Sequence, residues 1–389
     1  MNDKSHHSER GLRSPFWRRA LAVVTVLVLL VCSAPRATAQ CHVEMAKLLA
    51  TEGLPQTYNA ADVSISGNTL VIGSIRSGIG GVAYVFYRNE GGPDRWGQAA
   101  RLEPAGIVAH EQFGSSVVIE GDTIAVGAAG HAGGRGAVYI FERDLGGLDR
   151  WGETKRLTYS SGSPFGSLGR SVAISGDTIV AGAPDESSFY VGSVWVFERH
   201  LGGQDNWGEA AKLIQSDGII GVGYFGGNVA IEGDTIASGA YGAYNQGLES
   251  GATYVFERDA GGAGQWGEVQ RLHASDFADQ DFFGSDVSLS GDTLAIASDS
   301  AGGAVYFFER NGTWSERSKT DNLGLGDEPD VALDGDTLLV QRRTEPGAVV
   351  LLGRDQGGAD NWGTLSEHEA SDGYSGNQFG REVAMDGNS

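Results

Sequence analysis

One acidic residue type recurs at a fixed position in the chain, where its carboxylate could bind a cation or take part in catalysis. An aspartate follows glycine in five copies of a turn that reads Gly-Asp-Thr: Asp122, Asp177, Asp234, Asp292 and Asp336. Each turn supplies one carboxylate, with Glu120 or Glu232 next to it in two copies, whereas Ca²⁺ takes roughly six to eight oxygen ligands. Gly followed by Asp also suits the positive φ of a tight hairpin. We therefore predict that these aspartates are structural.

A second group of carboxylates lies in the segment 276–281, which reads DFADQD. Asp276, Asp279 and Asp281 are close enough in sequence to be candidate calcium ligands. A solvated acidic loop is the alternative interpretation. No other cofactor is predicted.

The sequence gives little support for catalysis. Five of the eight histidines are scattered along the repeats without an H-x-H or H-E-x-x-H pair: His110, His131, His200, His273 and His368. A nucleophile elbow is also missing from the sequence. We expect a protein that is not an enzyme. A secreted lyase or hydrolase that acts on polysaccharides remains the alternative.

The charge and the N-terminus indicate where the protein works. The net charge of -22 disfavours nucleic acid as a partner, because the phosphate backbone is also negative. Arg18 and Arg19 precede an apolar run at 20–34, and Ala37-Thr38-Ala39 fits a signal peptidase site. We predict that residues 1–39 are a cleaved signal peptide, which leaves no membrane span, with a retained signal anchor as the alternative. The mature protein is then secreted or at the cell surface, or periplasmic in a bacterium.

The elements that position these residues form a long-period repeat. The glycine of the turn recurs at intervals of 44 to 58 residues, and tryptophan follows the same rhythm from Trp96 to Trp362. Such a period is typical of a solenoid, a propeller or an array. One copy reads as four strands, at 171–174, 178–183, 193–199 and 207–213, with β-branched and aromatic residues between turn formers.

The polarity of the strands favours a propeller. In the segment 137–141, both the Val138 and Ile140 face and the Tyr139 and Phe141 face are apolar, so this strand is expected to be covered on both sides. The fourth strand mixes Trp with charged residues, as a partly exposed outer strand would. We predict an all-β propeller of four-stranded antiparallel blades over residues 40–389, in which radial closure hides most sheet edges. A linear β-array is the alternative.

The number of strands predicts an incomplete seventh blade. The segment 44–53 matches the outer-strand segment 209–218, six complete sets follow, and 379–385 reads as a lone inner strand. A seven-bladed ring would close by joining these two ends. We expect that the complete protein has seven blades and that this chain stops within the last one.

These motifs resemble a known family. Phe-Gly opens the first strand at Phe113-Gly114, Phe225-Gly226, Phe283-Gly284 and Phe379-Gly380, and Gly182-Ala183-Pro184 closes a second strand. This set resembles the FG-GAP repeat, which builds the N-terminal β-propeller of integrin α chains and occurs in secreted bacterial proteins. The resemblance implies a seven-bladed propeller with a role in extracellular binding, cell adhesion or scaffolding. The calcium loop of integrin-like repeats is absent from these turns. A Kelch-like propeller is the rival architecture, but Kelch repeats place the Gly-Gly pair at a different position within the repeat.

The predicted topology also indicates a binding surface. In a propeller, the loops between the second and third strands share a face with the loops that lead to the next blade. Those loops carry exposed aromatic and polar residues, which suit contacts with proteins or glycans. We select Asp185, Tyr190, Tyr241 and Tyr244 as candidate ligand-binding residues. The expected partner is an extracellular protein or glycan. A purely structural module of a larger surface protein is the further alternative.

Overall fold

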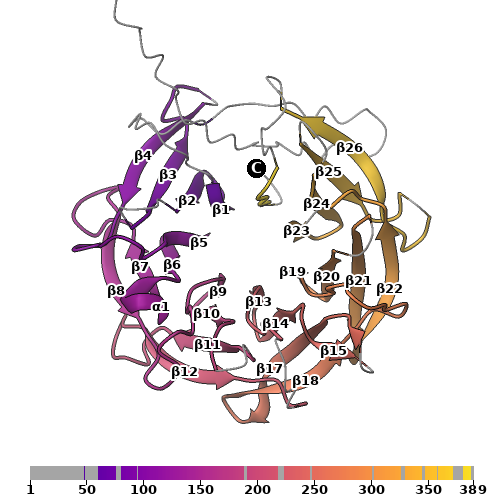
Figure 1. Cartoon of the computed structure of the whole chain (residues 1–389). Helices are drawn as coiled ribbons and strands as arrows, with labels where there is room; N and C mark the ends of the chain where they lie inside the picture. Colours follow the sequence, from indigo (N-terminus) through magenta and orange to yellow (C-terminus); the bar gives the residue numbers. More distant parts are fainter. Residues whose placement is uncertain are drawn as a thin grey trace, which may run out of the picture.

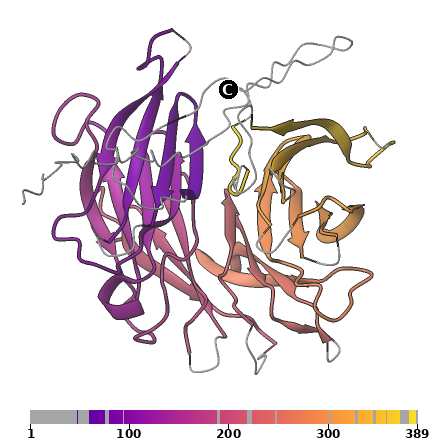
Figure 2. The same ribbon diagram turned by 45° about the horizontal axis from the view of Figure 1, so that its top comes forward.

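Radially arranged antiparallel sheets form a propeller around a central axis (Figures 1 and 2). The computed structural model describes residues 48, 60–75, 80–93, 95–187, 191–217, 223–245, 248–299, 302–325, 329–343, 347–356, 358–370 and 380–386. These residues contain six four-stranded sheets, each ordered from the axis outward along the sequence. The predicted all-β fold and its six complete blades are confirmed. Residues 1–39, and with them the predicted signal peptide, lie outside the described residues.

Each blade takes four consecutive long strands. Blades 1 to 3 consist of β1 (Ala60–Ser66), β2 (Thr69–Ser74), β3 (Val82–Arg88) and β4 (Trp96–Leu102); β5 (Phe113–Glu120), β6 (Thr123–Ala128), β7 (Ala137–Glu142) and β8 (Gly152–Leu157); and β9 (Val172–Ser175), β10 (Thr178–Ala183), β11 (Ser193–Glu198) and β12 (Gly208–Leu213). Blades 4 to 6 consist of β13 (Val229–Glu232), β14 (Thr235–Ala240), β17 (Ala252–Gly262) and β18 (Gln265–Leu272); β19 (Asp286–Ser290), β20 (Thr293–Ser298), β21 (Ala304–Asn311) and β22 (Thr313–Asp321); and β23 (Val331–Asp334), β24 (Thr337–Arg342), β25 (Ala348–Gly353) and β26 (Gly363–Glu369).

Short elements occupy the loops between second and third strands. The helix α1 (His131–Gly134) lies in blade 2, and the pair β15 (Tyr244–Asn245) and β16 (Leu248–Glu249) lies in blade 4. We call the face formed by these loops, together with those leading to the next blade, the loop face. Within the described residues, none of the helical structure is long and apolar enough to cross a membrane.

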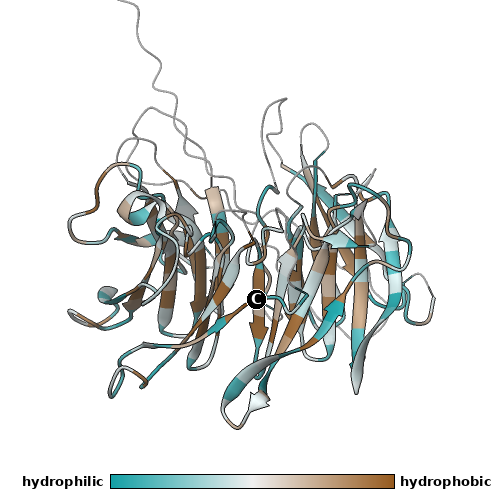
Figure 3. Ribbon diagram, turned by 60° about the horizontal axis from the view of Figure 1, so that its bottom comes forward, coloured by the Kyte–Doolittle hydropathy of each residue, from teal (hydrophilic) through white to brown (hydrophobic). Residues whose placement is uncertain are grey.

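The core lies between the blades. The second strands are almost wholly buried, whereas the outer strands β8 and β12 are mostly exposed or half-buried and end on a buried leucine. Figure 3 shows the apolar colouring along the middle strands and the polar colouring toward the outer strands and loops. One apolar cluster joins Val71 and Val85 of blade 1 to Phe113 and Tyr139 of blade 2. Equivalent clusters follow around the ring, which confirms that both faces of the inner strands are covered.

The packing explains why the Phe-Gly motif occurs together with a glycine near the end of the preceding blade's second strand. Phe225 is fully buried and makes an edge contact with the Tyr254 ring at 5.5 Å. A Cβ added to Gly182, in the preceding blade, would overlap the carbonyl oxygen of Gly226. The Phe-Gly pair of one blade therefore packs directly on the second strand of the blade before it. Only glycine permits this approach of the two backbones.

The turn aspartates take part in an arginine clamp between blades. Arg258 of blade 4 donates to Asp234 in its own turn (2.7 Å), and reaches back to Glu198 (2.5 Å) and Thr178 (3.0 Å) of blade 3. Its guanidinium also lies 4.7 Å from the centre of the Trp266 ring. The same arrangement of arginine, turn aspartate and outer-strand tryptophan recurs at Arg143, Arg199, Arg310 and Arg354. The predicted structural role of these aspartates thus extends to joining adjacent blades.

The segment 380–386 lies near the axis between blades 6 and 1 (Figures 1 and 2). The N–H of Val383 donates to Asp330 of blade 6, and Asp386 accepts from the N–H of Gly67 in blade 1. Ala384 packs against the apolar cluster of blade 1, which also contains Leu48. The segment thereby bridges the two ends of the row of blades. A seventh four-stranded sheet is not shown among the described residues, and the predicted outer strand at 44–53 lies outside them except for Leu48.

Candidate functional site

A cavity of about 930 Å³ follows the propeller axis. Its wall is built from the innermost strands of the six blades and from the segment 380–386. At the loop face the wall includes loop residues of blades 3, 4 and 5: Pro184, Asp185, Tyr224, Tyr241, Phe282 and Asp299. We call this end the mouth of the axial cavity. A cavity of this size is in the usual range for small-molecule sites, roughly 300–1,000 Å³.

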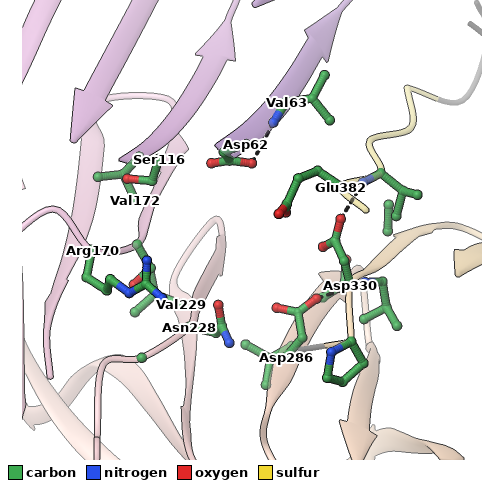
Figure 4. A pocket seen from close by; sticks show the side chains of 18 of the residues that line it. Asp62, Val63, Ser116, Arg170, Val172, Asn228, Val229, Asp286, Asp330 and Glu382 are labelled. Atoms are coloured by element: carbon green, nitrogen blue, oxygen red, sulfur yellow. Dashed lines mark hydrogen bonds between the residues drawn. The ribbon is translucent and has the colours of Figure 1, made fainter. Parts of the chain in front are cut away.

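One polar side chain from each blade position forms a ring in the cavity wall (Figure 4). The ring position is the residue directly before a valine near the start of the innermost strand. The ring consists of Asp62, Ser116, Ser171, Asn228, Asp286, Asp330 and Glu382. Its four acidic members come from blades 5 and 6, the segment 380–386 and blade 1, which are consecutive around the axis. One arc of the ring is therefore acidic, and the opposite arc carries Arg170 and neutral polar groups.

Six ring side chains bind the innermost segment of the next blade position. Asp62 accepts from the N–H groups of Val63 and Val117, both at 2.7 Å. Asp286 accepts from the N–H of Val331 at 2.8 Å, and Asp330 accepts from the N–H of Val383. The neutral members instead donate to carbonyl oxygens of the next blade. These contacts give the ring a structural role in fixing one blade against another.

Glu382 is the exception in the ring. Within the described part of the chain, its polar partner is Arg381, whose Nε lies 3.5 Å from Oε1. Figure 4 shows the Glu382 side chain projecting toward the cavity between Asp62 and Asp330. The carboxyl group of Glu382 is thus directed into the axial space and is not tied to the backbone of blade 1.

The acidic arc has strongly raised pKa values. Burial is the main cause, because it removes water from the charged forms, and it raises the pKa of Asp62 and of Asp286 to about 7. Burial also raises the pKa of Glu382 to about 10, and repulsion from Asp330 and Asp62 adds to the effect. The pKa of Asp330 is raised well above its ordinary value by burial and by repulsion from Asp286, with which Asp330 shares a side-chain hydrogen bond. The Glu382 carboxyl therefore retains its proton at neutral pH, and the Asp62 and Asp286 carboxyls titrate close to pH 7.

Two tyrosines form an aromatic stack at the mouth. The rings of Tyr224 and Tyr241 are 4.9 Å apart and inclined by 11°. Tyr224 has φ 51° and Phe282 has φ 50°, a left-handed conformation that is unusual for aromatic residues. The N–H of Gly227 donates to the carbonyl oxygen of Tyr224 at 2.9 Å, which fixes the turn. Aromatic side chains are thereby positioned along the wall of the axial cavity.

The structure brings together two of the four predicted ligand-binding residues. Asp185 and Tyr241 both line the mouth, and Asp185 accepts a hydrogen bond from the Ser167 hydroxyl at 2.6 Å. Tyr244 lies outside the cavity wall, in β15, with 45% of its surface exposed. Tyr190 lies outside the described residues.

The predicted calcium ligands are directed to different partners. Asp276 accepts from Lys319 Nζ at 2.8 Å and from the Tyr306 hydroxyl at 2.9 Å, and the hydrogen bond to Lys319 is the main reason why the pKa of Asp276 is lowered. Asp279 accepts a hydrogen bond from the N–H of Glu249 at 3.0 Å, and Asp281 accepts one from the N–H of Ala278 in its own loop. Over the ranges that the structure describes, no group of three or more His, Cys, Asp or Glu side chains is arranged to hold a metal ion.

Sequence reasoning did not identify the axial ring. Its signal is the residue before the valine of each innermost strand, which is polar or acidic in every copy from Asp62 to Glu382. That position becomes meaningful only when the copies are aligned around an axis. The loop residues were found because exposed aromatic residues stand out in a single copy.

Comparison with known proteins agrees with this architecture. A search of curated proteins finds no match. The crystal structure of a candidate 6-phosphogluconolactonase from Bacteroides fragilis is similar, with a TM-score of 0.53 and 13% sequence identity, covering 88% of this chain and 94% of that protein. At this identity, the likeness concerns the fold alone. The FG-GAP repeat matches five segments, at 42–86, 96–141, 151–197, 207–256 and 266–308. These matches cover more than half of the chain, and it therefore belongs to the FG-GAP repeat family.

Proposed function

We propose that this chain is an exported, non-enzymatic FG-GAP propeller that binds an extracellular glycan at the mouth of its axial cavity. The observation that carries the proposal is the Tyr224–Tyr241 stack, which lines a cavity of about 930 Å³ together with acidic and neutral hydrogen-bonding groups. Flat aromatic faces beside polar groups suit the apolar faces and the hydroxyl groups of sugar rings.

The dimensions and the charge of the site support this choice of ligand. The cavity has the volume of a small-molecule site, whereas a folded protein partner needs a broad contact surface. The chain carries a net charge of -22, which disfavours strongly anionic polysaccharides by long-range repulsion. A neutral or cationic glycan therefore fits the site better than a sulfated or uronic one.

A catalytic function is the second candidate, and one observation favours it. Asp286 and Asp330 share a hydrogen bond and have raised pKa values, as paired carboxyl groups do in some hydrolases. However, both carboxyl groups also accept backbone N–H groups of the next blade position. This bonding accounts for their location without catalysis, so we place binding first.

A glycan array probed with the mature chain tests the proposal. We expect a hit whose affinity falls at least tenfold in Tyr241→Ala, because this change removes one ring of the stack. Tyr244→Ala is the matched control, since Tyr244 lies in the same loop but outside the cavity wall. Equal loss of binding in both variants, or in neither, would contradict a site at the mouth.

The enzymatic alternative has its own readout. Each bound glycan is incubated with the wild-type protein, and the products are followed by mass spectrometry. Intact glycan after prolonged incubation is expected. Cleavage that disappears in Asp330→Asn would overturn the non-enzymatic part of the proposal.

A further inference from the structure

We infer that the axial cavity selects glycans that carry a protonated amine, with Glu382 as the residue that pairs with the ammonium group. This inference rests on the proposed function, because it specifies the ligand class of the same site. The ligand would be an amino sugar with a free amine, whose ring contacts the aromatic mouth while its ammonium group reaches the acidic arc.

The first support is the geometry of the acidic arc. Asp62, Asp286 and Asp330 are held by backbone N–H groups, so their positions are set by the fold. Glu382 has one methylene more than these residues and projects into the cavity (Figure 4). An ammonium group carries three hydrogen-bond donors. Placed beside Glu382, it would face Asp62 and Asp330 as well.

The second support is the separation of functions along the cavity. The aromatic stack lies at the mouth, in the loop that leads to blade 4 and in the loop between β14 and β17, whereas the acidic arc lies at the innermost strands and the segment 380–386. A ligand with an apolar ring face and one cationic substituent matches this division. The basic groups of the wall are Arg170, across the cavity from the arc, and Arg381, beside Glu382. Asp185 and Asp299 add carboxylates near the mouth.

Binding of an amine should be coupled to proton release. A buried carboxyl group that holds its proton would lose it when an ammonium group arrives, because the ion pair is strong where water is excluded. The step is R–NH₃⁺ plus HOOC–Glu382 giving the R–NH₃⁺ and carboxylate pair plus one H⁺ released to solvent. Because the pKa of the Glu382 carboxyl lies at about 10, the exchange is expected at neutral pH. The affinity should therefore rise with pH until the amine itself loses its proton.

Isothermal titration calorimetry with a matched pair of probes tests the inference. The probes are the β-1,4-linked tetramer of glucosamine and its fully N-acetylated counterpart, which has no positive charge. Titrations of the mature chain at pH 6.5, in two buffers with different ionisation enthalpies, give both the affinity and the number of protons released. We expect the amine form to bind at least tenfold more tightly and to release protons, whereas the acetylated form releases none.

Substitutions then locate the effect. Glu382→Gln is isosteric with the protonated acid, so the fold should be kept, and it should remove the preference for the amine and reduce the proton release. Glu209→Gln is the control, because Glu209 lies on the outer strand β12 and binds Ser160. Equal affinity for both tetramers in the wild type, or an unchanged preference in Glu382→Gln, would overturn the inference.

The outcome for Tyr241→Ala separates this inference from the proposed function. If Tyr241→Ala weakens both tetramers equally while the wild type shows no preference for the amine, the binding site stands and the amine selectivity fails. If the amine preference persists and Tyr241→Ala has no effect, the acidic arc binds amines and the proposed glycan site at the mouth fails. If neither tetramer binds, the amine-selective glycan site is contradicted.

Discussion

The arginine clamp predicts a large loss of stability from one partly exposed residue. Arg258→Ala removes the hydrogen bonds to Glu198 and Thr178 of the preceding blade, the bond to Asp234 in its own turn, and the contact with the Trp266 ring. Because two of these partners belong to another blade, the substitution should weaken the packing between blades 3 and 4. Asp234→Asn removes only the charge of the turn aspartate.

The contacts give an order of magnitude for each variant. The bond to Glu198 is mostly shielded from solvent and is worth roughly 1.5 kcal/mol, and the bond to Thr178 roughly 1 kcal/mol. The arginine–tryptophan contact adds about 0.5 kcal/mol. The pair with Asp234, which is 75% exposed, adds about 0.5 kcal/mol. Arg258→Ala should therefore cost about 3.5 kcal/mol, and Asp234→Asn about 0.5 kcal/mol.

Urea unfolding followed by tryptophan fluorescence measures both losses, since Trp266 is buried beneath the arginine. Arg317→Ala is the matched control, because Arg317 is more exposed and its ion pair, with Glu309, has a separation of 3.5 Å. A loss for Arg258→Ala no larger than that for Asp234→Asn or Arg317→Ala would refute the role of the clamp between blades.

Three further predictions concern the packing and the acidic arc. Gly182→Ala should destabilise the protein by roughly 1–3 kcal/mol or more, because the new Cβ meets the Gly226 carbonyl, whereas Gly223→Ala, with no atom nearer than 3.5 Å, should be nearly neutral in the same urea assay. Leu48→Ala should cost roughly 2–5 kcal/mol, because Leu48 is buried in the cluster of blade 1, while Leu148→Ala should have little effect on the melting temperature, since Leu148 is 84% exposed. The unfolding free energy should fall as pH rises from about 4 to 8, because the pKa values of Asp62 and Asp286 are about 7 in the folded protein and 3.8 ordinarily. The stabilising contribution of each group is complete at low pH and is lost as pH rises through 7, by at most about 4 kcal/mol per group. Asp62→Asn should flatten this pH dependence, and an unchanged slope would contradict the raised pKa.

The fold could be predicted because its signals are local and repeated. The Gly-Asp turn, the β-branched strands and the Phe-Gly motif recur in each copy, and a ring of blades is the arrangement that covers both faces of the inner strands. The role of the turn aspartates was predicted only in part. The turn itself follows from Gly and Asp, but the partner of Asp234 is an arginine 24 residues away that also reaches the previous blade. Contacts of this kind depend on how the blades stack.

The candidate site was harder to predict than the fold. Asp185 and Tyr241 could be selected because polar and aromatic residues stood out in variable loops, and both line the mouth. Tyr244, only three residues after Tyr241, belongs to the short strand β15 and lies outside the cavity wall. The acidic arc is formed by residues more than 300 positions apart, such as Asp62 and Glu382, which meet only because the ring brings its two ends together.

The location of a bound glycan tests the central claim most directly. A crystal structure of the mature chain with the tightest-binding oligosaccharide from the array would show which residues contact the sugar. The account predicts a sugar ring against the Tyr224–Tyr241 stack, with its polar groups directed along the axis toward Glu382. A ligand bound on the outer strands or on the face opposite the loop face, with the axial cavity free of sugar, would contradict it.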